Sequence, residues 1–217
     1  FGAWNNANNW SATPAGPVGV GVPGASDVAI FSPIANGFVQ FDLAVTTVQK
    51  IQIDNNYNGT FFVTTPLNLT GAADGLGFEM QSASSTFLIS PVGGIFNCTA
   101  GFSMVRGVFN LANPGNHNIG GNFTLNGPGN PTTGNPIRPD FNIVNGVNLT
   151  FGGNFTLANP SSFGTADNST VIFAKQANGV ANINIAASPF VNASFYDLVF
   201  NEDLNATDDN RANLVGT

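Results

Sequence analysis

A repeated hexapeptide constrains the fold of this chain more than any other feature. The sequence GGNFTL occurs at 120–125 and again at 152–157. Two looser repeats accompany it: LANP at 111–114 and 157–160, and an apolar-Asn-Leu-Thr sequence at 67–71 and 147–152. Recurring words of this kind indicate structural repeats, in which the same residue types occupy equivalent places in successive units.

Short alternating runs indicate β-strands along most of the chain. Each run has four to six residues, carries β-branched or aromatic side chains at alternate positions, and is bounded by Gly, Asn, Pro or Asp. The runs lie at 27–31, 38–43, 48–53, 60–63, 147–151, 170–173, 181–185 and 195–200. Helix signals are nearly absent, because Gly, Pro or Asn interrupts every apolar stripe of helical spacing.

Together the repeats and the short strands predict an all-β fold, a parallel β-helix (β-solenoid) with irregular coils. Successive coils of a solenoid lie about 4.8 Å apart, so each residue type stacks on its own kind. Inward Phe, Leu, Val and Ile would form the core, Asn side chains would form amide ladders at turns, and Gly would permit corners with positive φ. A β-sandwich is the alternative, since it also uses short strands and Gly/Asn turns, but it does not require identical recurring words.

The chain divides into three expected parts. Residues 1–33 are expected to form an N-terminal entry or cap module, and residues 34–200 the solenoid body. The segment 126–139 contains four prolines and three glycines and is expected to be a long loop within that body. Residues 201–217 lose the alternation and gather acids, which indicates an acidic tail or cap.

Charge is scarce and acidic, which excludes several classes of partner. Charged residues make up 8% of the chain and the net charge is −7, against about 25% charged residues in an ordinary soluble domain. The five cations are isolated from one another: Lys50, Arg106, Arg138, Lys175 and Arg211. No basic patch can form, so we expect neither nucleic acid nor anionic membrane as a partner. No apolar run approaches the ~20 residues that span a bilayer, so membrane insertion is not expected.

A neutral polar surface suits the outside of a cell. Asn occurs at 32 positions and Gly at 26, so amides supply the solvation that Lys and Glu usually provide. The sequence starts with Phe1 rather than Met, which suggests a processed mature end or an excised fragment. We therefore expect a secreted protein, extracellular or attached to the cell surface.

Groups suited to catalysis are few. His117 is the only histidine and lies in the polar segment PGNHNIGG, where we expect a solvated loop residue. Cys98 is the only cysteine. It is either a small buried residue, or a reactive thiol or the site of an intermolecular bridge. One His and one Cys cannot make a zinc site. The acids appear isolated at strand edges and turns, with too few Lys, Arg or His to complete a site that cleaves polysaccharides. The prediction is that the chain is not an enzyme.

Sequons for N-glycosylation are abundant. The motif Asn-x-Ser/Thr makes ten asparagines possible glycosylation sites: Asn9, Asn58, Asn68, Asn97, Asn122, Asn148, Asn154, Asn168, Asn192 and Asn205. No cofactor is expected. Ca²⁺ is the one alternative, because carboxylate and amide oxygens gather in two places: the acids Glu202, Asp203, Asp208 and Asp209, and the loop Asp54, Asn55 and Asn56. The other interpretation of the acids is a solvated tail.

Three segments resemble a known group of proteins. The order of residues in 4–32 resembles the entry module of large bacterial surface proteins of the autotransporter and adhesin-like type. The matching residues are Trp4, Asn9, Trp10, Ser11, Pro23, Asp27, Val28 and Phe31. The segments 48–71 and 169–201 resemble coils of the same proteins. The resemblance implies a β-helix, exposure at the cell surface and no known catalysis.

The expected function is a non-catalytic extracellular structural protein, a self-assembling subunit of a sheath, filament or surface layer. Its partner would be a second copy of itself, because solenoid ends present unpaired strand edges and few charges oppose their pairing. Phe1, Phe31, Phe61 and Phe62 are candidates to contact that partner chain. The alternative is an adhesin or carbohydrate-binding passenger module, with glycans as partners. A row of exposed aromatics would distinguish it, and the candidates are Trp4, Trp10, Tyr57 and Tyr196.

Overall fold

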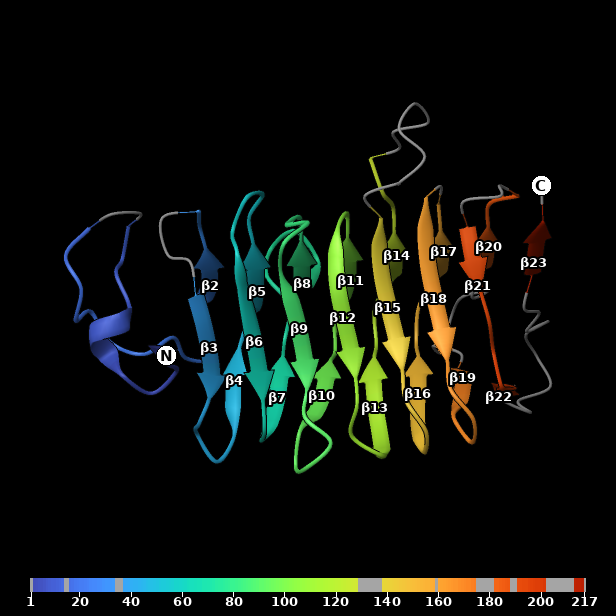
Figure 1. The fold of residues 1–217 in the computed structure, drawn as a ribbon, viewed down its shortest axis with the longest axis horizontal. Coiled ribbons are helices and arrows are strands. Elements are labelled where there is room, and N and C mark those ends of the chain that lie inside the picture. The colour runs from blue at the N-terminus through green and yellow to red at the C-terminus, as the bar shows by residue number, and fades with distance from the viewer. Residues whose placement is uncertain are drawn as a thin grey trace.

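The chain folds into a parallel β-solenoid, as the sequence predicts, and the β-sandwich alternative is excluded. The computed structural model describes residues 2–13, 16–33, 37–128, 138–158, 160–174, 182–187, 191–201 and 213–216. Its strands belong to three parallel sheets, which the chain visits in the same order in each coil. The coils follow one another along the long axis of the molecule, with the first and last coils at opposite ends (Figure 1).

Each sheet is named here after its first strand in the first full coil. The β2 sheet comprises β2 (Val28–Phe31), β5 (Lys50–Ile53), β8 (Leu76–Met80), β11 (Gly101–Met104), β14 (Phe123–Leu125), β17 (Phe155–Leu157), β20 (Asn182–Ile185) and β23 (Asn213–Gly216). The β3 sheet comprises β1 (Gly2–Ala3), β3 (Gly37–Phe41), β6 (Gly59–Val63), β9 (Thr86–Ile89), β12 (Gly107–Leu111), β15 (Pro139–Ile143), β18 (Ser161–Thr165) and β21 (Val191–Ala193). The β4 sheet comprises β4 (Thr46–Val48), β7 (Pro66–Leu69), β10 (Ile95–Cys98), β13 (Gly115–Ile119), β16 (Val147–Phe151), β19 (Thr170–Ala174) and β22 (Asp197–Asn201).

The repeated hexapeptide marks equivalent places in two neighbouring coils. Strand β17 pairs with β14 in register, so that Phe155 lies on Phe123 and Leu157 on Leu125. The apolar-Asn-Leu-Thr repeat also falls in one sheet, in β7 and β16, with β10 and β13 between them. Like side chains are therefore stacked because the backbone of one coil lies on the next, which confirms the prediction made from the repeats.

The repeat LANP does not mark equivalent places. Leu111 ends β12 in the β3 sheet, whereas Leu157 ends β17 in the β2 sheet. In both copies Leu is the buried last residue of a strand, and in the first copy Asn113 and Pro114 form the bend that follows. This tetrapeptide is thus a strand-ending signal that suits any corner, and interpreting it as a coil repeat was wrong.

Two columns of phenylalanine rings fill the core. In the β3 sheet Phe61, Phe87, Phe109, Phe141 and Phe163 stack with centroid separations of 5.3, 5.2, 4.9 and 5.5 Å. In the β2 sheet the column is Phe78, Phe102, Phe123 and Phe155, with separations of 4.7, 5.1 and 5.1 Å. The two columns meet edge to face, as where the rings of Phe102 and Phe109 cross at 84°. All nine rings are fully buried, so each combines apolar burial with favourable ring geometry.

Amide ladders run along the outside of the sheets. The Nδ2 of Asn118 donates to the Oδ1 of Asn97 at 3.3 Å, and the Nδ2 of Asn97 donates to the Oδ1 of Asn68 at 3.2 Å. A second ladder joins Asn142 to Asn110 at 3.0 Å. Such ladders were expected at turns, but these occupy outward positions within strands. In-register strands hold such side chains one strand spacing apart, which suits amide-to-amide hydrogen bonds.

Aromatic residues close the N-terminal end. Trp4 is fully buried and stacks on Phe41 with centroids 4.5 Å apart, while Trp10 meets it edge-on at 4.7 Å. The Nε1–H of Trp10 donates to the backbone oxygen of Trp4 at 2.9 Å. Trp10 follows the short 3₁₀ helix η1 (Ala7–Asn9). Within the expected entry module of residues 1–33, Trp4 and Trp10 thus cover the first coil, while β1 and β2 belong to the sheets.

The other predicted boundaries lie partly outside the described residues. Of the expected loop 126–139, residues 129–137 are outside, and the final residue, Pro139, begins β15. Of the expected tail 201–217, residues 202–212 and 217 are outside. Residue Asn201 ends β22, and β23 pairs with β20, so the part of this segment that is described extends the sheets.

The ring columns predict that loss of one ring in β11 lowers the stability of the fold. Phe102→Ala removes a buried ring between Phe78 and Phe123, and should lower the free energy of unfolding by about 3–5 kcal/mol. Its neighbour Ser103 faces outward, so Ser103→Ala should change the free energy of unfolding by less than about 0.5 kcal/mol. Chemical denaturation of both variants checks this. Equal destabilisation by the two substitutions would contradict the inward stacking of Phe102.

Candidate functional site

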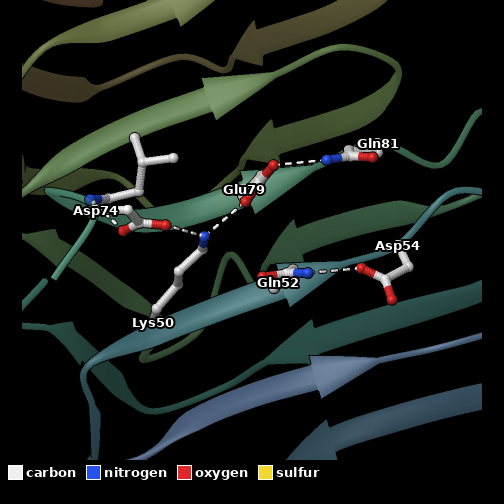
Figure 2. A network of polar contacts seen from close by, with 7 residues as sticks. Lys50, Gln52, Asp54, Asp74, Glu79 and Gln81 are labelled. Carbon is white, nitrogen blue, oxygen red and sulfur yellow. Dashed lines mark hydrogen bonds and ion pairs between the residues drawn. The ribbon is translucent and has the colours of Figure 1, made fainter. Parts of the chain in front are cut away.

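Among the described residues, the most concentrated group of charges lies on the outside of the β2 sheet, around Lys50 (Figure 2). Lys50 begins β5 and is only 3% exposed. Its Nζ donates to the Oδ2 of Asp74 at 2.6 Å and to the Oε2 of Glu79 at 2.6 Å. Glu79 comes from β8, the next strand of the sheet, and Asp74 from the turn before it. We call these three residues the Lys50 triad.

Neighbouring polar groups fix both carboxylates of the triad. The backbone N–H of Leu76 donates to the Oδ1 of Asp74 at 3.0 Å. The Nε2 of Gln81 donates to the Oε1 of Glu79 at 2.6 Å. Each carboxylate therefore receives one hydrogen bond from Lys50 on one oxygen and another on the second oxygen, which holds the triad in a single geometry.

The contacts of the triad favour the charged forms of Lys50 and Asp74. Burial alone lowers the pKa of Lys50, but hydrogen bonds to Asp74 and Glu79, with the charges of both carboxylates, raise it overall. The hydrogen bond from Lys50, followed by that from the Leu76 amide, lowers the pKa of Asp74. The triad thus joins two coils by charge-assisted hydrogen bonds. The expectation of isolated acids was wrong for Asp74 and Glu79, because strand pairing brings them together across a separation in sequence that shows no motif.

His117 is a core residue and not a solvated loop residue, so that expectation was wrong. It is 3% exposed and occupies an inward position of β13. Its Nδ1 accepts from the backbone N–H of Phe96 at 3.0 Å, and its Nε2 lies 2.9 Å from the oxygen of Asn113. With Nδ1 accepting, Nε2 carries the hydrogen and the ring is neutral. Both nitrogens are engaged in structure, so His117 has no free nitrogen for proton transfer.

Burial lowers the pKa of His117, and its hydrogen bond to Asn113 opposes this only in part. The unfolded chain therefore binds a proton at a higher pH than the folded chain does. As a result, the free energy of unfolding should fall as the pH drops from about 6.5 towards 5. His117→Gln should remove this contribution, which reaches at most about 1.4 kcal/mol per pH unit. Denaturant unfolding of both proteins at several pH values checks it, and their slopes should agree between about pH 7 and 8, where His is neutral. Equal slopes at acidic pH would show that His117 does not titrate as described.

Cys98 is a small buried residue, which confirms one of the interpretations that the sequence left open. It is fully buried in β10. Burial raises the pKa of its thiol to about 12, so the thiolate is scarce at neutral pH and the thiol is a poor nucleophile.

The contacts of the described acids bear on the cation sites that the sequence suggests. They contain no group of three or more His, Cys, Asp or Glu side chains suited to a metal ion. In the loop proposed for Ca²⁺, the Oδ1 of Asp54 accepts from Gln52 at 2.8 Å and the Oδ1 of Asn55 accepts from Arg106 at 3.3 Å. The C-terminal acids Glu202, Asp203, Asp208 and Asp209 lie outside the described residues.

The four aromatic candidates for glycan binding do not form a row. Trp4 and Tyr57 are buried in the core, and Trp10 packs edge-on against Phe31. Tyr196 is 57% exposed, beside β22. These side chains belong to opposite ends of the solenoid, so they cannot contact one sugar chain together.

Of the phenylalanines expected to contact a partner chain, two are buried. Phe31 and Phe61 face the core, in β2 and β6, so that expectation was wrong for them. Phe62 points outward and is half-buried, with its ring 6.2 Å from that of Phe38. Phe1 lies outside the described residues.

Several of the ten sequon asparagines use their side-chain amides in hydrogen bonds within the solenoid. Asn97 and Asn148 each commit Nδ2, the atom to which a glycan is attached, to the asparagine of the preceding coil. Three more accept a hydrogen bond from the next coil through Oδ1: Asn68, Asn122 and Asn154. The Nδ2 of Asn9 donates to the backbone oxygen of Ala3. Five sequon asparagines are exposed: Asn9, Asn58, Asn122, Asn168 and Asn192. Asn205 lies outside the described residues.

Asn168 is the best placed acceptor, because it occupies an exposed turn with φ 54°. In a host that N-glycosylates secreted proteins, glycopeptide mapping of the folded product should find sugar at Asn168 and none at Asn97 or Asn148. Asn168→Gln should remove the mass of one glycan. A sugar on Asn97 in protein that retains the fold would contradict the ladder geometry.

Comparison with known proteins found no matching family model, no matching curated protein and no matching solved structure. In the part of the chain that the structure describes, no helix is long and apolar enough to cross a membrane. The function therefore has to be argued from the solenoid itself.

Proposed function

We propose that this chain is a non-catalytic extracellular structural protein, a self-assembling subunit of a sheath, filament or surface layer. The observation that carries the proposal is the difference between the two ends of the solenoid. The N-terminal coil is covered by Trp4 and Trp10, whereas the coil that ends with β22 leaves core positions exposed.

The uncovered positions lie on β22, the outermost described strand of the β4 sheet. Leu198 pairs with Val171 and Phe200 with Phe173, so both side chains occupy inward positions. The rings of Phe200 and Phe173 stack with centroids 5.7 Å apart. Leu198 is 37% exposed and Phe200 39% exposed, although their counterparts one coil earlier are buried. A second solenoid end would bury these side chains and add a strand at the outer edge of β22, which is how sheet edges associate.

The outer face of the β4 sheet supports lateral packing. Its first six strands, β4 to β19 in the sheet order, contain no Lys, Arg, Asp or Glu. A continuous outward row consists of Thr47, Asn68, Asn97, Asn118, Thr150 and Ile172. Without like charges to repel another copy, such a face favours side-by-side contact. Pairing through one open end gives dimers, and contact through this face would extend them into a layer.

The proposed location is the cell exterior. The low charge, the Asn-rich surface and the resemblance of residues 4–32 to entry modules of bacterial surface proteins all support it. The adhesin or carbohydrate-binding alternative keeps this location, but has less support, since only Tyr196 among its four candidate aromatics is well exposed.

The test is self-association of the purified protein. Sedimentation and electron microscopy over a range of concentrations should show dimers and larger assemblies. Phe200→Asp should weaken association at least about tenfold, which corresponds to about 1.4 kcal/mol. Val199→Thr, on the outward side of the same strand, is the matched control and should leave it unchanged. A monomer at every concentration would contradict the proposal.

A further inference from the structure

The Lys50 triad holds the groups that an intramolecular amide bond requires. These are a primary amine, a carboxyl group within reach of it, and a second carboxylate that touches the amine and can move its protons. We propose that the Nζ of Lys50 condenses with the side-chain carboxyl of Asp74, with loss of water, so that a covalent bond joins two consecutive coils.

The distances place each group for this reaction. Nζ lies 2.6 Å from Oδ2 of Asp74, the oxygen that would leave, and 2.6 Å from Oε2 of Glu79. The Leu76 N–H donates to Oδ1 of Asp74 at 3.0 Å, so it would stabilise the negative charge that develops on this oxygen. Gln81 fixes the other oxygen of Glu79, which keeps Oε2 directed at Nζ. Figure 2 shows the amine pointing between the two carboxylates.

The reaction balances without any further reagent. Oε2 of Glu79 accepts one proton from the ammonium group and delivers it to Oδ2 of Asp74. The freed electron pair of Nζ then attacks Cγ and forms the N–C bond. A second proton passes from the nitrogen through Glu79 to Oδ2, the Cγ–Oδ2 bond breaks, and Oδ2 leaves as water. One hydrogen stays on the amide nitrogen, and Glu79 ends as the carboxylate with which it began, so its role is that of a catalytic residue.

The ionised resting pair makes this reaction slow but does not prevent it. The neutral amine is a minor form, because both carboxylates stabilise the ammonium group. Against this, well-oriented groups held in contact react as if at concentrations of about 10⁵ M or more. The side chain of Asp74 is 50% exposed, so water reaches Cγ, but the amine is held against it at an effective concentration far above that of water. The cross-link should therefore accumulate with time after folding.

No other ion pair among the described side chains offers the same chemistry. Arg138 and Asp140 pair at 2.9 Å, but a guanidinium group is a poor nucleophile that stays protonated. Gln52 and Asp54 lie beside the triad, but their contact contains no amine. Asp54 is thus a matched control, an acid on the same face that does not touch Lys50.

Intact-mass spectrometry of the purified, folded protein tests the proposal. After prolonged incubation at neutral pH, the wild-type protein should lose the mass of one water, and a protease digest should yield a branched peptide joining Lys50 to Asp74. Asp54→Asn should lose the same water. Lys50→Arg and Glu79→Gln should keep the branched peptide from forming.

One competing reaction has the same mass change and is distinguished by these variants. Asp74 precedes Gly75, and cyclisation of an Asp-Gly pair onto the backbone also releases one water. That product would persist in Lys50→Arg and would give no branched peptide. The proposal is overturned if the wild-type protein keeps its full sequence mass, if water loss occurs without the branched peptide, or if the branch joins Lys50 to Glu79.

Discussion

In-register pairing of parallel strands is the constraint on which the rest of the structure depends. It places each side chain one strand spacing from its counterpart in the next coil, and the consequence differs with the side chain. Inward phenylalanines become continuous ring columns, because like rings meet in an offset stack. Outward asparagines become ladders, because each amide offers one donor and one acceptor along the axis. One geometric relation therefore organises both the core and the surface.

This relation also explains how much could be predicted from the sequence. The copies of GGNFTL at Phe123 and Phe155 identify equivalent positions directly, since identical stacking favours identical words. His117 misled because its polar neighbours resemble a loop, although it lies within a strand. The LANP tetrapeptide misled because a strand-ending signal can recur at corners that are not equivalent. The contacts of Lys50 with Asp74 and Glu79 could not be read from spacing, because the coil length that brings them together is irregular. Only the strand pairing reveals them.

Polar groups in this molecule act mainly as structural partners. His117 uses both ring nitrogens to satisfy backbone groups, Asn97 uses its amide to join two neighbours, and the Lys50 triad satisfies its own charges across a coil boundary. Burying such a group costs free energy unless the group is hydrogen-bonded or paired with an opposite charge. Their pairing leaves few of them free for chemistry on an external substrate, in keeping with the proposed structural role.

The irregular coil length has a consequence for how such a chain can change. Asparagines in contact on neighbouring coils are separated by 21 residues between Asn97 and Asn118, and by 32 between Asn110 and Asn142. The register holds in both cases, so the difference in length between the two coils leaves the strand pairing intact. Lengthening a flexible connection costs little free energy. The scaffold can therefore accept new peptide at its corners, and acquire new surface features there, while its frame remains intact.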